Sequence, residues 1–162
     1  MIYFIINTFY FTNLIPPVPL ALKEGIVAHN VQKTKNGFEV SYEKNHWSTF
    51  WRDYNEIITL QKNDPVYVFT TIFAPTEIRK PILHRWFKFD NNNEKWLKTD
   101  EIQYEIIGGR NKGYRGYTYK ENTHPGKWKV EVLTLEEQIL GVLKFEIVIK
   151  PKQEVNISKS AY

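Results

Sequence analysis

The chain has 162 residues, of which 42% are hydrophobic, 25% charged and 15% aromatic, with a formal net charge of +4 and no cysteine. This length suits one folded domain, and the lack of cysteine excludes a disulfide framework, a thiolate metal site and a cysteine nucleophile. The small positive charge argues against a nucleic-acid partner, and the many aromatic residues favour β structure.

The amino-terminal stretch Met1–Leu22 carries no charged side chain. Its first part, Met1–Phe11, is apolar and aromatic, and two interpretations stay open. It is either the end of a membrane helix whose earlier part is absent from this chain, or a buried first strand. The prolines at positions 16, 17 and 19 predict an extended connector after it.

Apolar and polar residues alternate with a period of two through the body of the chain, which predicts strands. The predicted strands cover residues 38–43, 66–73, 82–89, 102–106, 127–132 and 144–150. The run 66–73 is apolar on both faces, which indicates a central strand. The stretch Asn45–Leu60 is less regular and suits either a short helix or an irregular loop.

Short strands separated by frequent turns are typical of an antiparallel β-sandwich. We therefore predict an all-β sandwich, immunoglobulin-like or jelly-roll-like, with an extended proline-containing amino-terminal connector. Trp86, Trp128 and Phe145 are expected in its core, with the two tryptophans on facing strands. The expected organisation is a hydrophobic segment and connector at residues 1–22, the sandwich at 23–151 and a polar tail at 152–162.

His84 is the histidine of greatest interest for chemistry. It precedes Trp86 by two positions on a predicted strand, so both side chains should share a face. A half-buried histidine bonded to backbone is one interpretation, and a ligand-binding residue or catalytic base is the other. The histidines lack the spacing of a helical zinc site, and the acidic residues form no recognisable catalytic pair, so we expect neither a metal nor a cofactor.

The segment from Gly108 to Tyr117 combines four glycines with three cations. Its backbone amides, together with Arg110 and Arg115, could hold a phosphate or carboxylate. A tight glycine-containing hairpin with solvated cations is the alternative. If the domain lies beside a membrane, Arg110, Lys112, Arg115 and Lys120 are also candidates for contact with anionic lipid.

Trp47 and Trp51 lie together in the irregular segment. Exposed aromatic side chains on a sandwich loop can stack on sugar rings, which makes these two residues candidates for carbohydrate binding. The alternative is that they cap one end of the sandwich as a small satellite core.

Four stretches of the sequence carry a resemblance to a known family: FYFTNLIPPVPLALKEGI, VFTTIFAPTEIRKPILHRW, GGRNKGYRGYTYKEN, and PGKWKVEVLT with QILGVLKFEI. In this order they resemble the bacterial domain of unknown function 2914 (DUF2914) family, over roughly residues 10–148. The resemblance implies a domain at the carboxyl end of a polytopic membrane protein, and it favours the membrane-helix interpretation of Met1–Phe11. The family has no assigned activity, so the resemblance implies no catalytic residues.

These observations favour a non-catalytic, membrane-associated bacterial β-sandwich. Its expected partner is a membrane or membrane protein, a small ligand or a glycan, and not a nucleic acid. Two alternatives stay open: a carbohydrate-recognition module that uses Trp47 and Trp51, and an enzyme that uses His84. The candidate ligand-binding residues are Trp47, Trp51, His84, Arg110 and Arg115.

Overall fold

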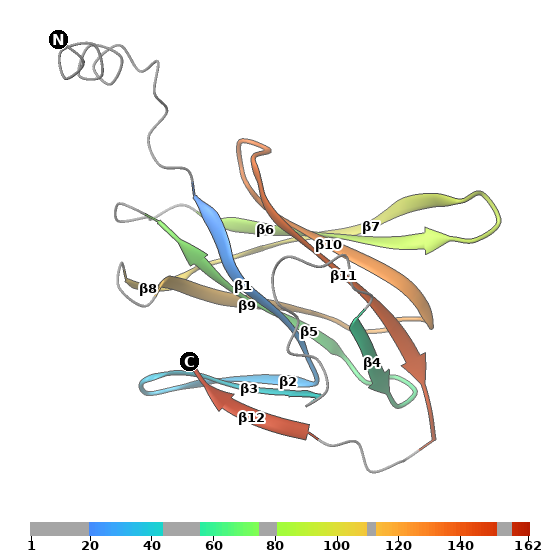
Figure 1. The fold of residues 1–162 in the computed structure, drawn as a ribbon, viewed down its shortest axis with the longest axis horizontal. Helices are drawn as coiled ribbons and strands as arrows, with labels where there is room; N and C mark the ends of the chain where they lie inside the picture. Colours follow the sequence, from blue (N-terminus) through green and yellow to red (C-terminus); the bar gives the residue numbers. More distant parts are fainter. Residues whose placement is uncertain (1–19, 44–55, 75–80, 110–112, 152–156) are drawn as a thin grey trace, which may run out of the picture.

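The computed structural model describes residues 20–43, 56–74, 81–109, 113–151 and 157–162, and in these it contains strands and the turns between them. Two sheets pack face to face, and a third, smaller sheet lies against the outer face of one of them (Figure 1). Within the described residues, every strand pair except one is antiparallel. The predicted all-β antiparallel sandwich is therefore confirmed.

The first sheet has the strand order β1-β5-β9-β8. Its strands are β1 (Ala21–Ala28), β5 (Val66–Phe73), β9 (Gly113–Lys120) and β8 (Ile107–Gly109). As predicted, β5 is a central strand, because Val68 and Ile72 point into the sandwich while Phe69 points to the small sheet. The glycine-rich segment contributes the β8–β9 hairpin, of which residues 110–112 lie outside the described residues.

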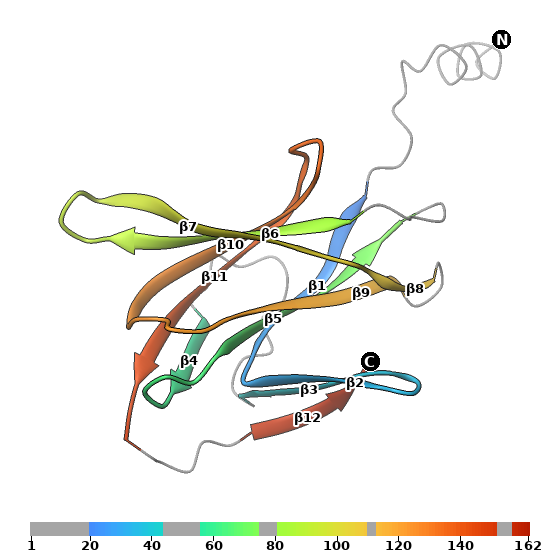
Figure 2. The same cartoon turned by 180° about the vertical axis from the view of Figure 1, so that it is seen from behind.

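The second sheet has the strand order β4-β11-β10-β6-β7. Its strands are β4 (Glu56–Leu60), β11 (Ile139–Ile149), β10 (Gly126–Thr134), β6 (Ile82–Asp90) and β7 (Lys95–Tyr104). The hairpin of β6 and β7 reaches beyond the rest of the sandwich (Figures 1 and 2). The expectation of a helix or loop up to Leu60 is wrong for the last residues of that stretch. They form β4, which runs parallel to β11 and buries Ile58 and Leu60 in the core.

The core between the two sheets contains both expected tryptophans. Trp86, Trp128 and Phe145 are at most 2% exposed. The expectation that the tryptophans lie on facing strands is wrong, because β6 and β10 are neighbours in one sheet. Trp86 pairs with Val130 and Trp128 pairs with Lys88, so the two indoles are diagonal neighbours on the same inner face.

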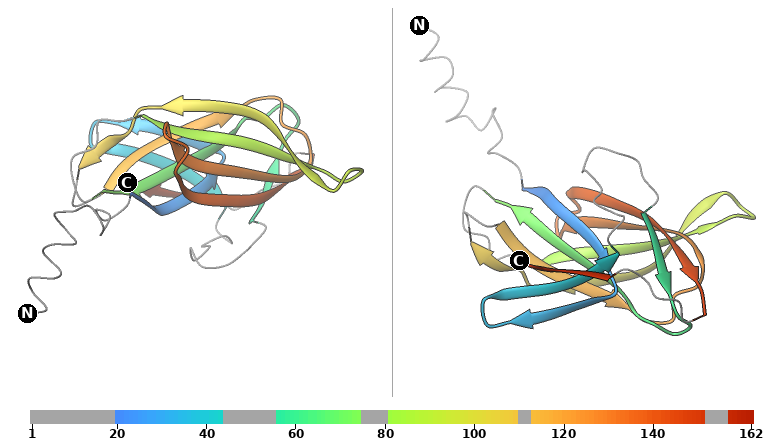
Figure 3. Two further views of the ribbon diagram at one scale, coloured as in Figure 1. Left: turned by 90° about the horizontal axis from the view of Figure 1, so that it is seen from above. Right: turned by 60° about the horizontal axis from the view of Figure 1, so that its bottom comes forward.

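The third sheet has the strand order β12-β3-β2. Its strands are β2 (Asn30–Thr34), β3 (Gly37–Glu43) and β12 (Ile157–Ala161), and it covers the outer face of the first sheet (Figure 3). Residues 157–161, which were expected in the polar tail, belong to the fold instead, because they form β12, which pairs with β3 along its length. The ring of Tyr162 then packs 5.1 Å from that of Phe69, which lies at the centre of the cluster beneath the small sheet.

Candidate functional site

His84 lies in a polar cluster that is buried between the two large sheets. The side chain of His84 is 0% exposed. Its Nδ1 is 2.8 Å from Thr118 Oγ1, and its Nε2 is 3.3 Å from Thr70 Oγ1. The Thr70 hydroxyl also lies 2.5 Å from the Tyr104 hydroxyl. Because β5, β6, β7 and β9 each contribute one of these residues, the cluster ties the two sheets together.

Burial sets the protonation of the cluster. It lowers the pKa of His84 from its ordinary 6.5 to about 3, so the imidazole is neutral at neutral pH. A neutral imidazole has one donor and one acceptor nitrogen, and a hydroxyl can serve either of them. Burial likewise raises the pKa of Tyr104 and keeps its hydroxyl protonated. The expectation of a half-buried His84 bonded to backbone is therefore wrong, because threonine side chains from the facing sheet supply both partners.

Arg115 lies on the opposite face of β9 from Thr118, away from the His84 cluster. Its Nη1 is 3.5 Å from the position that a Cβ atom on Gly37 would occupy, beside the turn between β2 and β3. The structure therefore does not bring Arg115 and His84 together. The candidates Trp47, Trp51 and Arg110 lie outside the described residues.

Lys120 is engaged within the fold. It forms an ion pair with Asp100 of β7, and its ammonium lies 5.9 Å from the centre of the Trp128 ring. Its side chain is 17% exposed. This placement leaves little of Lys120 for the lipid contact considered from the sequence, and Arg110 and Lys112 lie outside the described residues.

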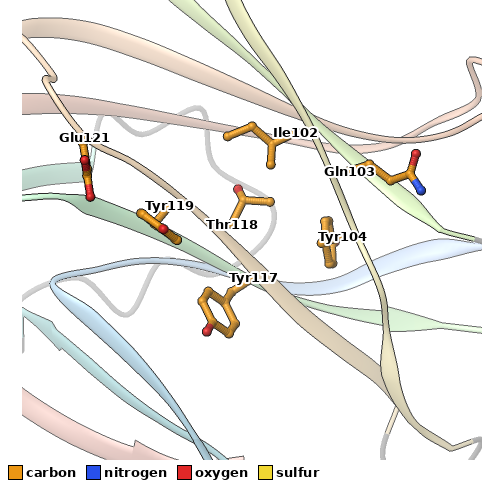
Figure 4. Close-up of a pocket in the computed structure, with 7 residues that line it drawn as sticks. All are labelled: Ile102, Gln103, Tyr104, Tyr117, Thr118, Tyr119 and Glu121. Carbon is orange, nitrogen blue, oxygen red and sulfur yellow. The ribbon is translucent and has the colours of Figure 1, made fainter.

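A groove of about 530 Å³ opens at the side of the sandwich, between the edge strand β7 and strand β9 (Figure 4). Its lining residues are Ile102, Gln103, Tyr104, Tyr117, Thr118, Tyr119 and Glu121. Tyr104 and Thr118 are mostly buried and belong to the His84 cluster, so the cluster holds the inner wall of the groove in place. Tyr119 is 50% exposed at the rim of the groove.

The close approach of β7 and β9 at this groove depends on a glycine. A side chain at Gly116 would run into the ring of Tyr104, because the ring lies directly over this residue. At the other end of the groove, the ion pair between Lys120 and Asp100 joins the same two strands. These two contacts set the spacing of β7 and β9 at both ends of the groove.

Three tyrosines line up beside the groove on the outer face of the first sheet. The ring of Tyr67 is 5.5 Å from that of Tyr119 and 6.1 Å from that of Tyr117. Burial chiefly raises the pKa of Tyr67, and Tyr117, Tyr119 and Glu121 raise it further. Sequence analysis did not single out these residues. The alternating Tyr117 and Tyr119 were a visible signal, but their partner Tyr67 lies on a strand that is distant in sequence.

A second hollow of about 320 Å³ lies between the small sheet and β4, and its polar groups hold the fold together. His29 Nε2 is 3.0 Å from Glu43 Oε1, which also accepts a hydrogen bond of 2.5 Å from the backbone N–H of Thr59. Glu43 thus joins the small sheet to the second sheet. Within the described residues, His, Asp and Glu side chains form no group that could hold a metal ion. In that same part of the chain, no helix has the length and apolar character needed to cross a bilayer.

A family model matches part of the chain. The model of the family described as "Protein of unknown function (DUF2914)" matches residues 79–147, which supports the resemblance expected from the sequence over this part of the chain. The matched range contains His84 and every residue that lines the groove between β7 and β9. No curated protein matches the chain.

Solved structures with a similar arrangement of strands share little sequence with this chain. An immunoglobulin-like protein from Pseudomonas aeruginosa has a TM-score of 0.44 and 9% identity, over 82% of this chain and 99% of its own. The DNA glycosylase AlkC from Pseudomonas fluorescens has a TM-score of 0.38 and 12% identity, over 87% and 33%. A β-glucosidase from Listeria innocua has a TM-score of 0.34 and 11% identity, over 80% and 16%. The chain thus spans a third or less of the two enzymes.

Proposed function

We propose that this chain is a non-catalytic β-sandwich that binds a partner in the groove between β7 and β9. The observation that carries the proposal is the half-exposed Tyr119, which stands beside Tyr67 and Tyr117 at the rim of a groove with a rigid inner wall. Tyrosine is enriched at binding hot spots because its rigid ring offers apolar area together with a hydroxyl.

The burial and the hydrogen bonds of His84 support a binding function rather than a catalytic one. A general base must reach the proton that it removes. His84 has no exposed surface, and both of its ring nitrogens already have hydroxyl partners. In this proposal the role of His84 is to position Thr118 and, through Thr70, Tyr104 at the inner wall of the groove.

Replacing Tyr119 with alanine is expected to weaken ligand binding by about tenfold or more, which is the usual loss at an aromatic hot spot. Ligands are first selected for the full chain from a library of random peptides and from a glycan array. The affinity of each selected ligand is then measured by isothermal titration calorimetry for the wild type and the variant. Because Tyr119 is half exposed, the free energy of unfolding should change little.

A matched control is Phe73→Ala, which removes an aromatic ring of similar exposure, 41%, from the neighbouring strand β5 and outside the groove. This variant should bind the selected ligands as the wild type does. The proposal is contradicted if no selected ligand discriminates between Tyr119→Ala and Phe73→Ala.

We also propose that the chain works at a membrane, with residues 1–22 as the point of attachment. The support is the absence of charge in these residues and the family context that the resemblance implies.

Replacing Ile6 with aspartate should lower the fraction of full chain that floats with phospholipid vesicles by about tenfold, because a carboxylate in the bilayer is costly. Asn91→Asp adds the same charge in the turn between β6 and β7 and should leave flotation unchanged. Equal flotation of the two variants would rule out this attachment.

A further inference from the structure

Strand β9 has a free edge beside the groove. On one side, β5 pairs with β9 from Tyr114 to Lys120. On the other side, β8 pairs only with Gly113 to Arg115. In the described part of the chain, no strand is hydrogen-bonded to Gly116–Lys120 on this outer side, although β7 approaches β9 near both ends of the stretch. Alternate residues of such an edge direct backbone N–H and C=O groups outward, where another strand can bind them.

The groove runs along this edge. It is lined by three consecutive residues of β9, Tyr117 to Tyr119, and by three consecutive residues of β7, Ile102 to Tyr104. Side chains of successive strand residues point to opposite faces of the sheet. A groove that contacts three successive residues must therefore lie at the edge of the strand. Figure 4 shows Thr118 between the two strands, with Tyr117 on the other side of β9. The groove thus presents backbone as well as side chains to a ligand.

The charge of the groove favours a cationic group in the ligand. The chain as a whole has a net charge of +4, yet Glu121 is the one residue with a formal charge among those that line the groove. The rings of Tyr67, Tyr117 and Tyr119 lie together on the outer face of the sheet, and the Glu121 carboxylate is near enough to Tyr67 to raise the pKa of its hydroxyl. Aromatic faces and a carboxylate together attract lysine and arginine side chains.

We infer that the groove takes an extended segment of a partner protein, which adds as a strand along Gly116–Lys120 of β9 and places a lysine or arginine beside Tyr119 and Glu121. This inference rests on the proposed function and names its ligand class. Backbone hydrogen bonds to the free edge supply affinity, as in other cases of strand addition, and alternate side chains supply specificity. The inward-facing residues of the segment are small or apolar, since they meet Ile102 and Thr118.

The experiment is an N-methylation scan of a peptide selected on the full chain from the random library. Methylation of one amide at a time removes a single donor and leaves the side chain in place. If the peptide adds as a strand, methylation at every second amide should weaken binding by about tenfold or more, and methylation at the intervening amides should have little effect. Amide hydrogen exchange should show new protection within Gly116–Lys120 when the peptide binds.

Two outcomes overturn the inference while leaving the proposed function intact. One is a peptide that depends on Tyr119 but shows no alternation in the scan. The other is a set of ligands that depend on Tyr119 and come from the glycan array alone. If no ligand from either source depends on Tyr119, the proposed function fails as well.

The position of the cationic residue has its own test. Glu121→Gln removes the carboxylate, so it should weaken the selected peptide by about threefold to tenfold and reduce the dependence of binding on salt. Glu94→Gln is the matched control, because Glu94 is an exposed carboxylate in the turn between β6 and β7, away from the groove. Equal affinities of these two variants would overturn the assignment of a lysine or arginine at this position.

Discussion

Replacing Trp86 with alanine is expected to lower the free energy of unfolding by about 3–5 kcal/mol, the range typical of large aromatic residues removed from a core. Trp86 is fully buried between the sheets, and its ring meets that of Phe145 edge to face at 6.2 Å. The loss combines the transfer of the indole to water with the cavity that remains among its neighbours. Urea denaturation checks it through a lower midpoint at an unchanged dependence on urea concentration.

Three further tryptophan variants test whether the loss is specific to the buried position of Trp86. Trp96→Ala removes an indole from the outer face of the second sheet, where it contacts Phe89, and should cost much less because the side chain is only partly buried. Trp86→Phe keeps an aromatic ring but removes an indole N–H that has no hydrogen-bond partner among the described residues, so it should cost less than Trp128→Phe. Trp128 donates its N–H to the carbonyl of His124 at 2.9 Å, and its replacement leaves this acceptor unpaired. Equal losses for Trp86→Ala and Trp96→Ala would contradict the placement of Trp86.

The sequence predicted best those strands whose burial follows from local alternation. In β10, Trp128, Val130 and Val132 are buried, whereas Lys127 is exposed. In β5, both faces are apolar because the sandwich covers one and the small sheet covers the other. Burial of this kind is visible along the chain because side chains alternate with a period of two.

Strands that are held mainly by backbone pairing were missed. Ile157–Ala161 is mostly polar and buries none of its side chains, so its membership of the small sheet depends on pairing with β3 across more than a hundred residues of sequence. The same kind of distant pairing decides which strands share a sheet. The alternation of apolar and polar residues predicted that Trp86 and Trp128 point inward. It did not predict that β6 and β10 are neighbours, because this pattern contains no information about strand order.

In the candidate site, too, local sequence indicated some residues, whereas others depend on contacts between distant strands. Sequence analysis singled out His84 as a polar side chain on an apolar strand, and the structure shows why it is tolerated there. Its partners Thr70 and Thr118 are ordinary strand residues with no motif, and each comes from the facing sheet. The groove likewise consists of neutral tyrosine, threonine, glutamine and isoleucine side chains with one glutamate, brought together by two strand edges. No local spacing marks such a set.

The burial of His84 has a consequence for stability as the pH falls. In the unfolded chain its pKa is near the ordinary 6.5, and in the folded protein it is about 3. Between these values the unfolded state binds one proton more than the folded state, so the free energy of unfolding decreases as the pH is lowered. The slope is about 1.4 kcal/mol per pH unit, which gives a loss of roughly 2 kcal/mol from about pH 6.5 to about pH 5. Well above pH 6.5 neither state binds this proton, and the contribution no longer changes.

Carboxylates act in a different part of the pH range. Hydrogen bonds from Lys98 and Arg85 lower the pKa of Glu101, and a hydrogen bond from Arg85 lowers that of Glu137, both from an ordinary 4.5. A carboxylate with a lowered pKa stabilises the fold above its unfolded value, and this contribution is lost only as the pH falls through the folded value. The loss of these contributions therefore begins below about pH 5, so His84 acts without them between about pH 6.5 and about pH 5.

The variant His84→Gln separates the effect of His84 on the pH dependence of stability from that of the carboxylates. Glutamine offers one donor and one acceptor to Thr70 and Thr118 but does not titrate, so its variant should be less stable than the wild type at neutral pH and should lose less stability between about pH 6.5 and pH 5. Chemical denaturation at several pH values measures both slopes. If the variant does not fold, NMR of the wild type gives the answer, since the His84 ring should stay neutral down to about pH 5. A His84 ring that titrates near 6.5 in the folded protein, or equal slopes for both proteins, would mean that His84 is accessible to water, and the rigid inner wall assigned to the groove would be lost with it.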